Sequence, residues 1–188
     1  LGIAAIGQSF VIISGGLDIS MGSNVALTAI ISTMVARDHG VFMGLSAGII
    51  AGLLLGLING LNITVLKLQP VIATVAMLNV ARGLTFLLSN NQVITPLPDG
   101  YQFLGRGELF GISNRIYLVF ALLIIGQLYL SHFISGRQMY AVGGDSEASH
   151  MSSIPVNRVK VTAYMISGLM AALTGIVISG RANSGQST

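Results

Sequence analysis

The sequence predicts an all-α fold, a polytopic transmembrane helical bundle with about six spans in its 188 residues. Two features of the composition indicate this fold. The hydrophobic class supplies 53% of the residues and 24 more are glycine, whereas a soluble domain is about 45–50% apolar with glycine included. Only 8% of the residues are charged, against about 25% in a soluble domain. So little charge cannot cover a water-exposed surface, which argues against a soluble enzyme.

Six apolar stretches account for the expected spans. A helix needs about 20 mainly apolar residues to cross the bilayer, whereas transmembrane strands are shorter and alternate apolar with polar residues. Because lipid offers no partner for bare backbone groups, we expect these stretches to be helices. They cover residues 1–13, 20–36, 41–64, 70–89, 116–134 and 159–180.

The two ends of the sequence differ in character. The first stretch is apolar from Leu1 onward, without an initiator Met, a basic region or a small-residue cleavage site, so it is not a signal peptide. Residues 181–188 form a polar tail. We therefore expect a single membrane domain over residues 1–188, truncated at both ends.

Residues that commonly hold cofactors or carry out catalysis are scarce. The chain has no Cys and three scattered His residues, so we expect no metal and no cofactor in it. The nine basic residues do not form a stripe, which argues against a nucleic-acid partner. No catalytic residue is predicted, since no nucleophile, base and orienting group occur together. The glycine spacings also lack the pattern of a phosphate-binding loop.

The loop charges do not orient the chain in the membrane, because an excess of Lys and Arg marks the cytoplasmic side and here the two sides are equal. Arg82 lies inside a predicted span. One side has Lys67, Arg137, Arg158 and Lys160, and the other has Arg37, Arg106, Arg115 and Arg181.

Glycine recurs at every fourth position of the third stretch. Successive members of such a series are offset by about 40° around a helix, so they form one slowly winding ridge. A ridge of this kind lets another helix approach closely, and we predict a role in helix packing without chemistry. The ridge consists of Gly44, Gly48, Gly52, Gly56 and Gly60.

Residues 14–23 contain the break between the first two stretches and the start of the second. Gly15 and Gly16 end the first helix, and either Asp18 or Ser20 is suited to cap the next one. The segment is either a tight surface turn or a break in a discontinuous helix that lines a cavity, where exposed backbone is tolerated.

Polar side chains inside apolar stretches cost free energy and are functional candidates by default. For Asn59 and Asn62 the alternatives are hydrogen bonds between helices and contact with a solute. Arg82 lies about 12 Å along the helix from Asn90, so it either extends toward the membrane surface or lines a pathway. The residues predicted for a solute path are Asp18, Asn59, Asn62, Asn79 and Arg82.

Residues 90–115 form the first long loop, with a turn composition from Pro96 to Gly100. Its aromatic residues are spaced like anchors at a membrane surface, where the segment would lie as a short helix or dock a soluble partner. These anchors are Tyr101, Phe103, Phe110 and Tyr117.

Residues 135–158 form the second long loop, which contains a local helix signal. Asp145 is a suitable N-cap, Glu147 falls in the first turn, and Pro155 restricts Ile154 and so ends the helix. About seven residues fit between these signals, and Pro155 can begin the last spanning helix. A short helix here suits mechanical contact with a soluble motor, and an ordered linker explains the pattern equally well.

Several of these segments together resemble a known family. They are residues 10–23, Ala81-Arg82-Gly83, residues 141–148, residues 154–160 and Ser167-Gly168. In this order, over nearly the whole chain, they resemble permease subunits of bacterial ribose-type ABC sugar importers. The sequence departs from the family pattern at His150, where Arg or Lys is frequent, and at Ser153, where Gly is frequent.

The resemblance implies a permease that imports a monosaccharide by alternating access across the bacterial inner membrane. Its implied partners are a cytoplasmic ABC ATPase, a periplasmic or lipid-anchored sugar-binding protein, and a second permease copy in a homodimer or heterodimer. It places residues 90–115 in the periplasm and residues 135–158 in the cytoplasm as the loop that couples to the ATPase. The implied coupling residues are Gly143, Gly144, Asp145, Glu147, Ala148, Ile154 and Pro155.

Two other kinds of protein fit the residues. One is an ion-coupled secondary sugar carrier without an ATPase, in which Asp18 and Arg82 serve the transport cycle. The other is a membrane anchor without transport activity, in which the glycine ridge only packs helices and the second loop is only a linker.

Overall fold

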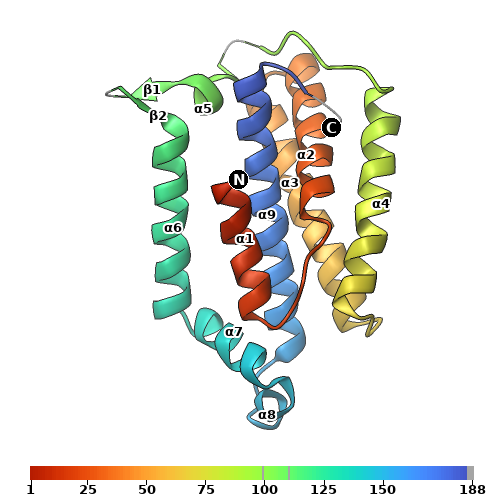
Figure 1. Cartoon of the computed structure of the whole chain (residues 1–188), viewed down its shortest axis with the longest axis vertical. Helices are drawn as coiled ribbons and strands as arrows, with labels where there is room; N and C mark the ends of the chain where they lie inside the picture. Colours follow the sequence, from red (N-terminus) through yellow and green to blue (C-terminus); the bar gives the residue numbers. More distant parts are fainter. Residues whose placement is uncertain (99, 110, 186–188) are drawn as a thin grey trace.

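The computed structural model describes residues 1–98, 100–109 and 111–185, and these form a bundle of helices with one short hairpin. Figure 1 shows the long helices running along the same axis. The elements are α1 (Gly2–Ile13), α2 (Met21–His39), α3 (Val41–Thr64), α4 (Pro70–Ser89), α5 (Phe103–Arg106), β1 (Glu108–Leu109), β2 (Ile112–Ser113), α6 (Asn114–His132), α7 (Ile134–Gly144), α8 (Ser146–Met151) and α9 (Val156–Ala182).

Each of the six predicted stretches is a helix. Four of them, α3, α4, α6 and α9, are long and apolar enough to cross a membrane by themselves. α1 has 12 residues, which is about 18 Å of helix and shorter than the roughly 30 Å bilayer core. α2 has 19 residues but is less apolar, because it buries polar side chains inside the bundle. The predicted all-α membrane bundle is confirmed, although only four of the six predicted stretches form helices that are long and apolar enough to span a membrane by themselves.

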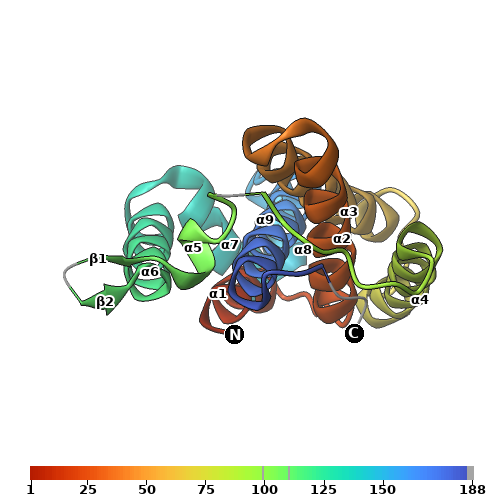
Figure 2. The same ribbon diagram turned by 90° about the horizontal axis from the view of Figure 1, so that it is seen from above.

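α9 occupies the centre of the bundle. It packs against α1, α2 and α3, while α4 and α6 lie on opposite sides of this central group (Figure 2). Only 6% of the apolar window of α6 is buried, against 61% for α9. α6 therefore leaves its apolar side chains for lipid, whereas α9 supplies the core.

The glycine ridge of α3 faces two helices in turn. A Cβ on Gly48 would lie 2.8 Å from Ser32 Cβ of α2, whereas one on Gly60 would lie 2.8 Å from Val161 Cα of α9. At the crossing of α3 and α9, a Cβ on Gly52 would meet the carbonyl oxygen of Gly168, and one on Gly168 would meet that of Gly52. The missing side chains thus let the backbones of α3 and α9 touch.

The two long loops leave opposite ends of the bundle. α5 and the β1–β2 hairpin lie at the end where α9 finishes, and α7 and α8 lie at the other end (Figure 1). In the hairpin Glu108 pairs with Ser113, and an isolated bridge joins Ile94 to Gly185. The first loop is thereby fastened to the segment that follows α9.

The prediction that Tyr101 anchors the first loop at a membrane surface is wrong. Its side chain is 1% exposed, and its hydroxyl lies 2.7 Å from Ser32 Oγ of α2. Phe103 and Tyr117 are 57% and 43% exposed, as anchors would be, and Phe110 lies outside the described residues. Tyr101 differs because the loop folds back over the bundle, where its ring packs with an apolar cluster.

Candidate functional site

Asp18 lies in the middle of the break between α1 and α2 and is only 5% exposed. Its Oδ1 accepts hydrogen bonds from the backbone N–H of Ser20 at 2.9 Å and from Ser20 Oγ at 2.6 Å. Its Oδ2 accepts from Ser167 Oγ of α9 at 2.8 Å. The carboxylate therefore ties the start of α2 to the central helix, through hydrogen bonds of the stronger, charge-assisted type.

Ser20 extends this network to a third helix. Its hydroxyl oxygen accepts from Asn24 Nδ2 at 3.0 Å and from Asn59 Nδ2 of α3 at 2.9 Å, and all three side chains are buried. One donated and two accepted bonds use the full capacity of this hydroxyl. The amide oxygens of Asn24 and Asn59 accept no bond from the described residues. Asn59 thus makes the interhelical hydrogen bond that was one of its two predicted roles.

Two glycines of the break provide close approaches. A Cβ on Gly16 would lie 2.7 Å from the hydroxyl of Tyr164, which donates to the carbonyl of Leu17 at 3.1 Å. Gly15 adopts φ +76°, and its Cβ would lie 3.4 Å from Gly143 Cα at the end of α7. The break is therefore packed against α9 and α7 on the side of Asp18 and Ser20, whereas Gly15, Leu17 and Ile19 are exposed, so it combines features of both predicted alternatives.

The five residues predicted for a solute path do not gather in one place. Asp18 and Asn59 belong to the buried network around Ser20. Asn62 is half-buried, and Asn79 donates to the carbonyl of Val75 on its own helix at 2.9 Å. A role for these four in the path stays a prediction.

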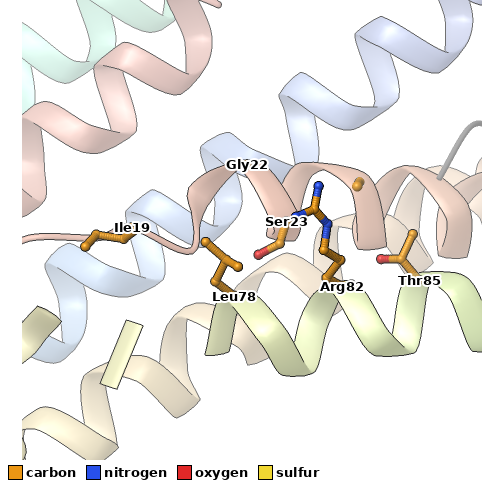
Figure 3. Close-up of a pocket in the computed structure, with 7 residues that line it drawn as sticks. Ile19, Gly22, Ser23, Leu78, Arg82 and Thr85 are labelled. Atoms are coloured by element: carbon orange, nitrogen blue, oxygen red, sulfur yellow. The ribbon is translucent and has the colours of Figure 1, made fainter. Parts of the chain in front are cut away.

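Arg82 lies apart from that network, beside a hollow between α2 and α4. The hollow has a volume of about 230 Å³, and its walls include Gly22, Ser23 and Ala26 of α2 and Arg82 and Thr85 of α4. In Figure 3 the Arg82 side chain extends from α4 toward Ser23. It does not run along α4 toward the membrane surface, which was the other prediction for this residue.

The second long loop contains the expected short helix. Asp145 is the N-cap of α8, and its Oδ1 accepts from the N–H groups of Glu147 at 2.9 Å and Ala148 at 3.0 Å. α8 has six residues, and α9 begins at Val156 with Pro155 as its N-cap. The local signals in the sequence are therefore confirmed to within one residue.

Ser153 ends α8 in a left-handed conformation with φ +62°. Its N–H donates to the carbonyl oxygen of His150, and the N–H of Ile154 donates to the carbonyl oxygen of Ser149. This kind of helix end usually has glycine at the left-handed position. The departure from the family pattern at Ser153 therefore has a conformational cost.

Gly143 and Gly144 differ sharply although they are neighbours. A Cβ on Gly143 would meet the carbonyl oxygen of Ile13 and would lie 3.2 Å from the N of Gly15. A Cβ on Gly144 would meet nothing within 4 Å. Gly143 therefore joins the second loop to the break that holds Asp18.

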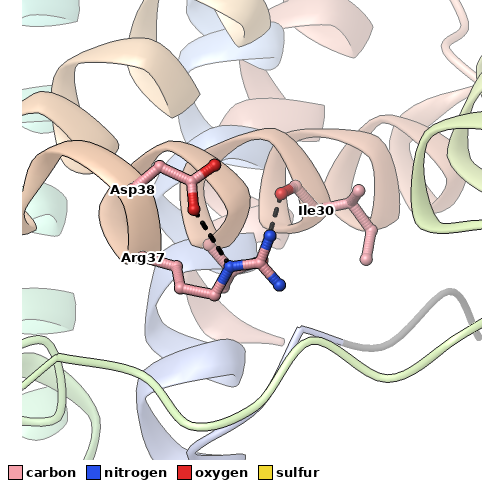
Figure 4. A network of polar contacts seen from close by, with 4 residues as sticks. Ile30, Arg37 and Asp38 are labelled. Carbon is pink, nitrogen blue, oxygen red and sulfur yellow. Dashed lines mark hydrogen bonds and ion pairs between the residues drawn. The ribbon is translucent and has the colours of Figure 1, made fainter.

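Charges elsewhere do not form a competing site. Within the described ranges the one ion pair joins Arg37 Nε to Asp38 at 3.1 Å, and both side chains are about half exposed (Figure 4). Exposed pairs of this kind contribute little to stability. Over the same residues no group of three His, Cys, Asp or Glu side chains is placed to hold a metal ion.

The polar face of α2 was not predicted from the sequence. Ser20, Asn24, Thr28 and Ser32 recur at every fourth position and are all buried. Their spacing puts them on one face of a helix, and four polar residues on one face of an apolar stretch are a signal for a hydrogen-bonded interior. Ser167 and Tyr164 carry no such signal, because they meet the break only in the folded chain.

Comparisons with known proteins found similar membrane permeases. The chain is 42% identical over 191 residues to the ribose import permease protein of Bacillus subtilis (strain 168), covering 100% of this chain and 59% of the relative. It is 36% identical over 186 residues to the L-arabinose transport system permease protein of Escherichia coli (strain K12), covering 98% of this chain and 57% of the relative. The chain thus spans somewhat under two thirds of the length of these relatives, and no significant match to a solved structure was found.

A family model described as "Branched-chain amino acid transport system / permease component" matches residues 1–188. The match covers every element of the bundle, from α1 through both long loops to the end of α9. The multi-pass helical architecture is what a membrane permease requires. The chain therefore belongs to this family of membrane permease components.

Proposed function

We propose that the chain is part of the permease subunit of an ATP-driven, binding-protein-dependent importer of a monosaccharide. It would work in the bacterial inner membrane with a cytoplasmic ABC ATPase, a sugar-binding protein outside and a second permease copy. The permease passes the solute by alternating access, and ATP is hydrolysed by the separate partner chain. The observation that carries the proposal is the capped helix α8, which lies beyond the end of the bundle and is joined to its interior through Gly143.

The relatives support a sugar as the solute. Their names give ribose for the Bacillus subtilis protein and L-arabinose for the Escherichia coli protein, whereas the family description gives branched-chain amino acids. Both named relatives match almost the whole chain, at 42% and 36% identity. A pentose is therefore the first solute to test, and leucine is the matched alternative.

The exposed face of α8 suits contact with a soluble partner. Glu147 and Ala148 are exposed in its first half, and Met151 at its end is 84% exposed. Ser149 faces the other way and is only 5% exposed. An apolar and acidic face that points away from the bundle is available to an ATPase groove.

The packing of α7 provides a route for motion from α8 into the membrane. The last turn of α7 touches Gly15, and three residues further along the chain Asp18 holds α2 to Ser167 of α9. Because Gly143 and Gly15 touch through backbone atoms, there is no flexible side chain between them to absorb a displacement. Movement of α8 by an ATPase would therefore shift the start of α2 relative to α9.

Cross-linking tests the contact with the ATPase. Cysteine is introduced at Glu147 or Met151 in the complex that contains the permease, its ATPase and its binding protein. Both variants are expected to cross-link to the ATPase. Ser149→Cys is the matched control and should not, because its side chain points into the protein. Equal cross-linking at all three positions, or none, would contradict the coupling role of α8.

Uptake in vesicles separates the importer from a secondary carrier. Uptake of ribose or L-arabinose should require ATP inside the compartment that holds the ATPase, and should survive a protonophore. Uptake that persists without ATP and collapses with the protonophore would instead support the ion-coupled carrier. Uptake of leucine in place of both sugars would overturn the monosaccharide while leaving the permease assignment intact.

A further inference from the structure

The hollow between α2 and α4 holds a charged side chain near the middle of a membrane-spanning helix. Arg82 is about 18 Å along α4 from Pro70 and about 12 Å from Asn90, so neither end of the helix is near. Among the described residues the one ion pair joins Arg37 to Asp38, so no carboxylate pairs with the guanidinium of Arg82. A charge at this depth costs free energy unless it faces water or a partner inside the protein.

The direction of the side chain identifies what it faces. Arg82 points across the hollow toward Ser23 at the start of α2 (Figure 3). Lipid headgroups lie at the membrane surface. A side chain that ran toward Asn90 would approach them, whereas a side chain that lies across the hollow does not. The guanidinium is therefore turned toward the space between the helices.

The polar groups of the hollow match a neutral solute with several hydroxyl groups. Arginine offers only donors. The hydroxyl of half-buried Ser23 donates to the carbonyl of Ser20 at 2.8 Å, whereas Thr85, which donates to the carbonyl of Ala81 at 2.7 Å, is fully buried and does not meet a solute. The Ser23 hydroxyl oxygen keeps lone pairs that can accept. A polyol, whose hydroxyls both accept and donate, uses both kinds of group.

The shape of the hollow supports the same partner. Small residues of α2 form one wall of the hollow, and a Cβ on Gly22 would meet nothing within 4 Å. The volume of about 230 Å³ is below the roughly 300–1,000 Å³ of pockets that enclose a ligand. The hollow therefore suits a small solute rather than a drug-sized ligand.

We propose that this hollow is a polyol-binding subsite in the solute path, with Arg82 as the hydrogen-bond donor and Ser23 as an acceptor. This inference rests on the proposed function for the solute, while the site itself follows from the cavity and the unpaired charge. Arg82 binds hydroxyl oxygens of the solute as it passes α2. Water in the path solvates the guanidinium when no solute is present.

The first test measures transport in the reconstituted complex of permease, ATPase and binding protein, with D-ribose and L-arabinose as probes. Arg82→Ala is expected to lower sugar uptake per ATP hydrolysed by about tenfold or more, and Arg82→Lys, which keeps one donor group, by less. Val80→Ala is the matched control, because Val80 lies two residues away and about 200° around α4. Unchanged uptake in Arg82→Ala would overturn the proposal.

The second test needs neither uptake nor the Arg82 variants. The 188 residues contain no Cys, so Ser23→Cys introduces one thiol into the hollow. It should react with hydrophilic methanethiosulfonate reagents, and faster with the anionic than the cationic reagent because Arg82 is adjacent. A cysteine at Ile125, 61% exposed on α6, is the control for a lipid-facing position and should stay unreactive.

The two tests distinguish the site from the proposed function. An unreactive Ser23→Cys overturns the subsite whatever the transport result. A reactive thiol together with uptake that needs no ATP overturns the importer and leaves a water-accessible subsite. If Arg82→Ala fails to assemble, the uptake by Arg82→Lys and the labelling of Ser23→Cys decide the outcome. Wild-type uptake by Arg82→Lys, together with equal labelling rates for the anionic and cationic reagents, would refute the role of Arg82.

Discussion

Alanine at Gly143 and at Gly144 should have opposite effects although the two residues are adjacent. Both lie in the last turn of α7, and neither has a positive φ, so alanine suits the backbone at either position. A methyl group at position 143 would overlap the carbonyl oxygen of Ile13, whereas one at position 144 would meet open space. The pair therefore isolates the contact between α7 and the break after α1.

The expected difference follows from two terms. Alanine in place of glycine favours a helix by up to about 1 kcal/mol, and this gain is common to both variants. Overpacking costs about 1–3 kcal/mol, and backbone atoms cannot rotate away from the added methyl group. Gly143→Ala should therefore be about 1–3 kcal/mol less stable than Gly144→Ala. For a chain of this size the difference corresponds to about 2–12 °C in Tm.

Thermal unfolding of the two purified variants in the same detergent measures this difference. Transport gives a second readout, because Gly143→Ala separates α7 from the segment that holds Asp18 and should lower ATP-driven uptake, whereas Gly144→Ala should not. Equal Tm values for the two variants would refute the packing argument. A lower Tm with normal uptake would leave the packing intact but remove Gly143 from the coupling route.

Three further substitutions test other parts of the structure. Asp18→Ala removes the acceptor of three hydrogen bonds and should lower the free energy of unfolding by about 2–4 kcal/mol. Asp18→Asn keeps one acceptor oxygen and should lower it by about half as much. The Tm values of the two variants measure both effects. An alanine variant as stable as wild type would mean that Asp18 does not hold α2 to α9. Ser153→Gly should raise stability by about 1 kcal/mol, because glycine adopts φ +62° without the cost paid by serine, and a lower Tm would contradict this explanation. Burial raises the pKa of Tyr101 from 10 to about 12. The neutral phenol therefore contributes about 2–3 kcal/mol to the free energy of unfolding below pH 10, and this contribution is lost as the pH rises from 10 through 12. Tyr101→Phe should abolish that part of the loss, and an unchanged pH profile of Tm would refute the assignment.

The positions of the helices could be predicted well because the signal is local. Each apolar stretch became a helix whose ends lie within about three residues of the expected ones, as for residues 159–180 against α9 from Val156 to Ala182. The short helix α8 was equally accessible, since Asp145 caps it through N–H groups two and three residues away. Signals that act over a few residues can be read without knowing the fold.

The role of the break could not be predicted in the same way. Its composition fits a surface turn as well as a buried discontinuity, and its contacts are made with Ser167 and Tyr164, which are almost 150 positions away. The same holds for Tyr101, whose spacing suits a membrane anchor but whose ring lies under a loop that folds over α2. Arg82 likewise needed the position of α2 before its direction was known.

The sequence by itself determined that the chain is a helical membrane protein, where its helices lie, and which family its motifs resemble. It did so because lipid requires long apolar stretches with internally satisfied backbones, and that requirement is visible in residue order. Only the tertiary structure decided that the glycine ridge faces first α2 and then α9, that Gly143 rather than Gly144 touches the break, and that Asp18 and Arg82 occupy different sites. These depend on which surfaces of distant helices meet, and close packing makes that outcome a property of the whole bundle.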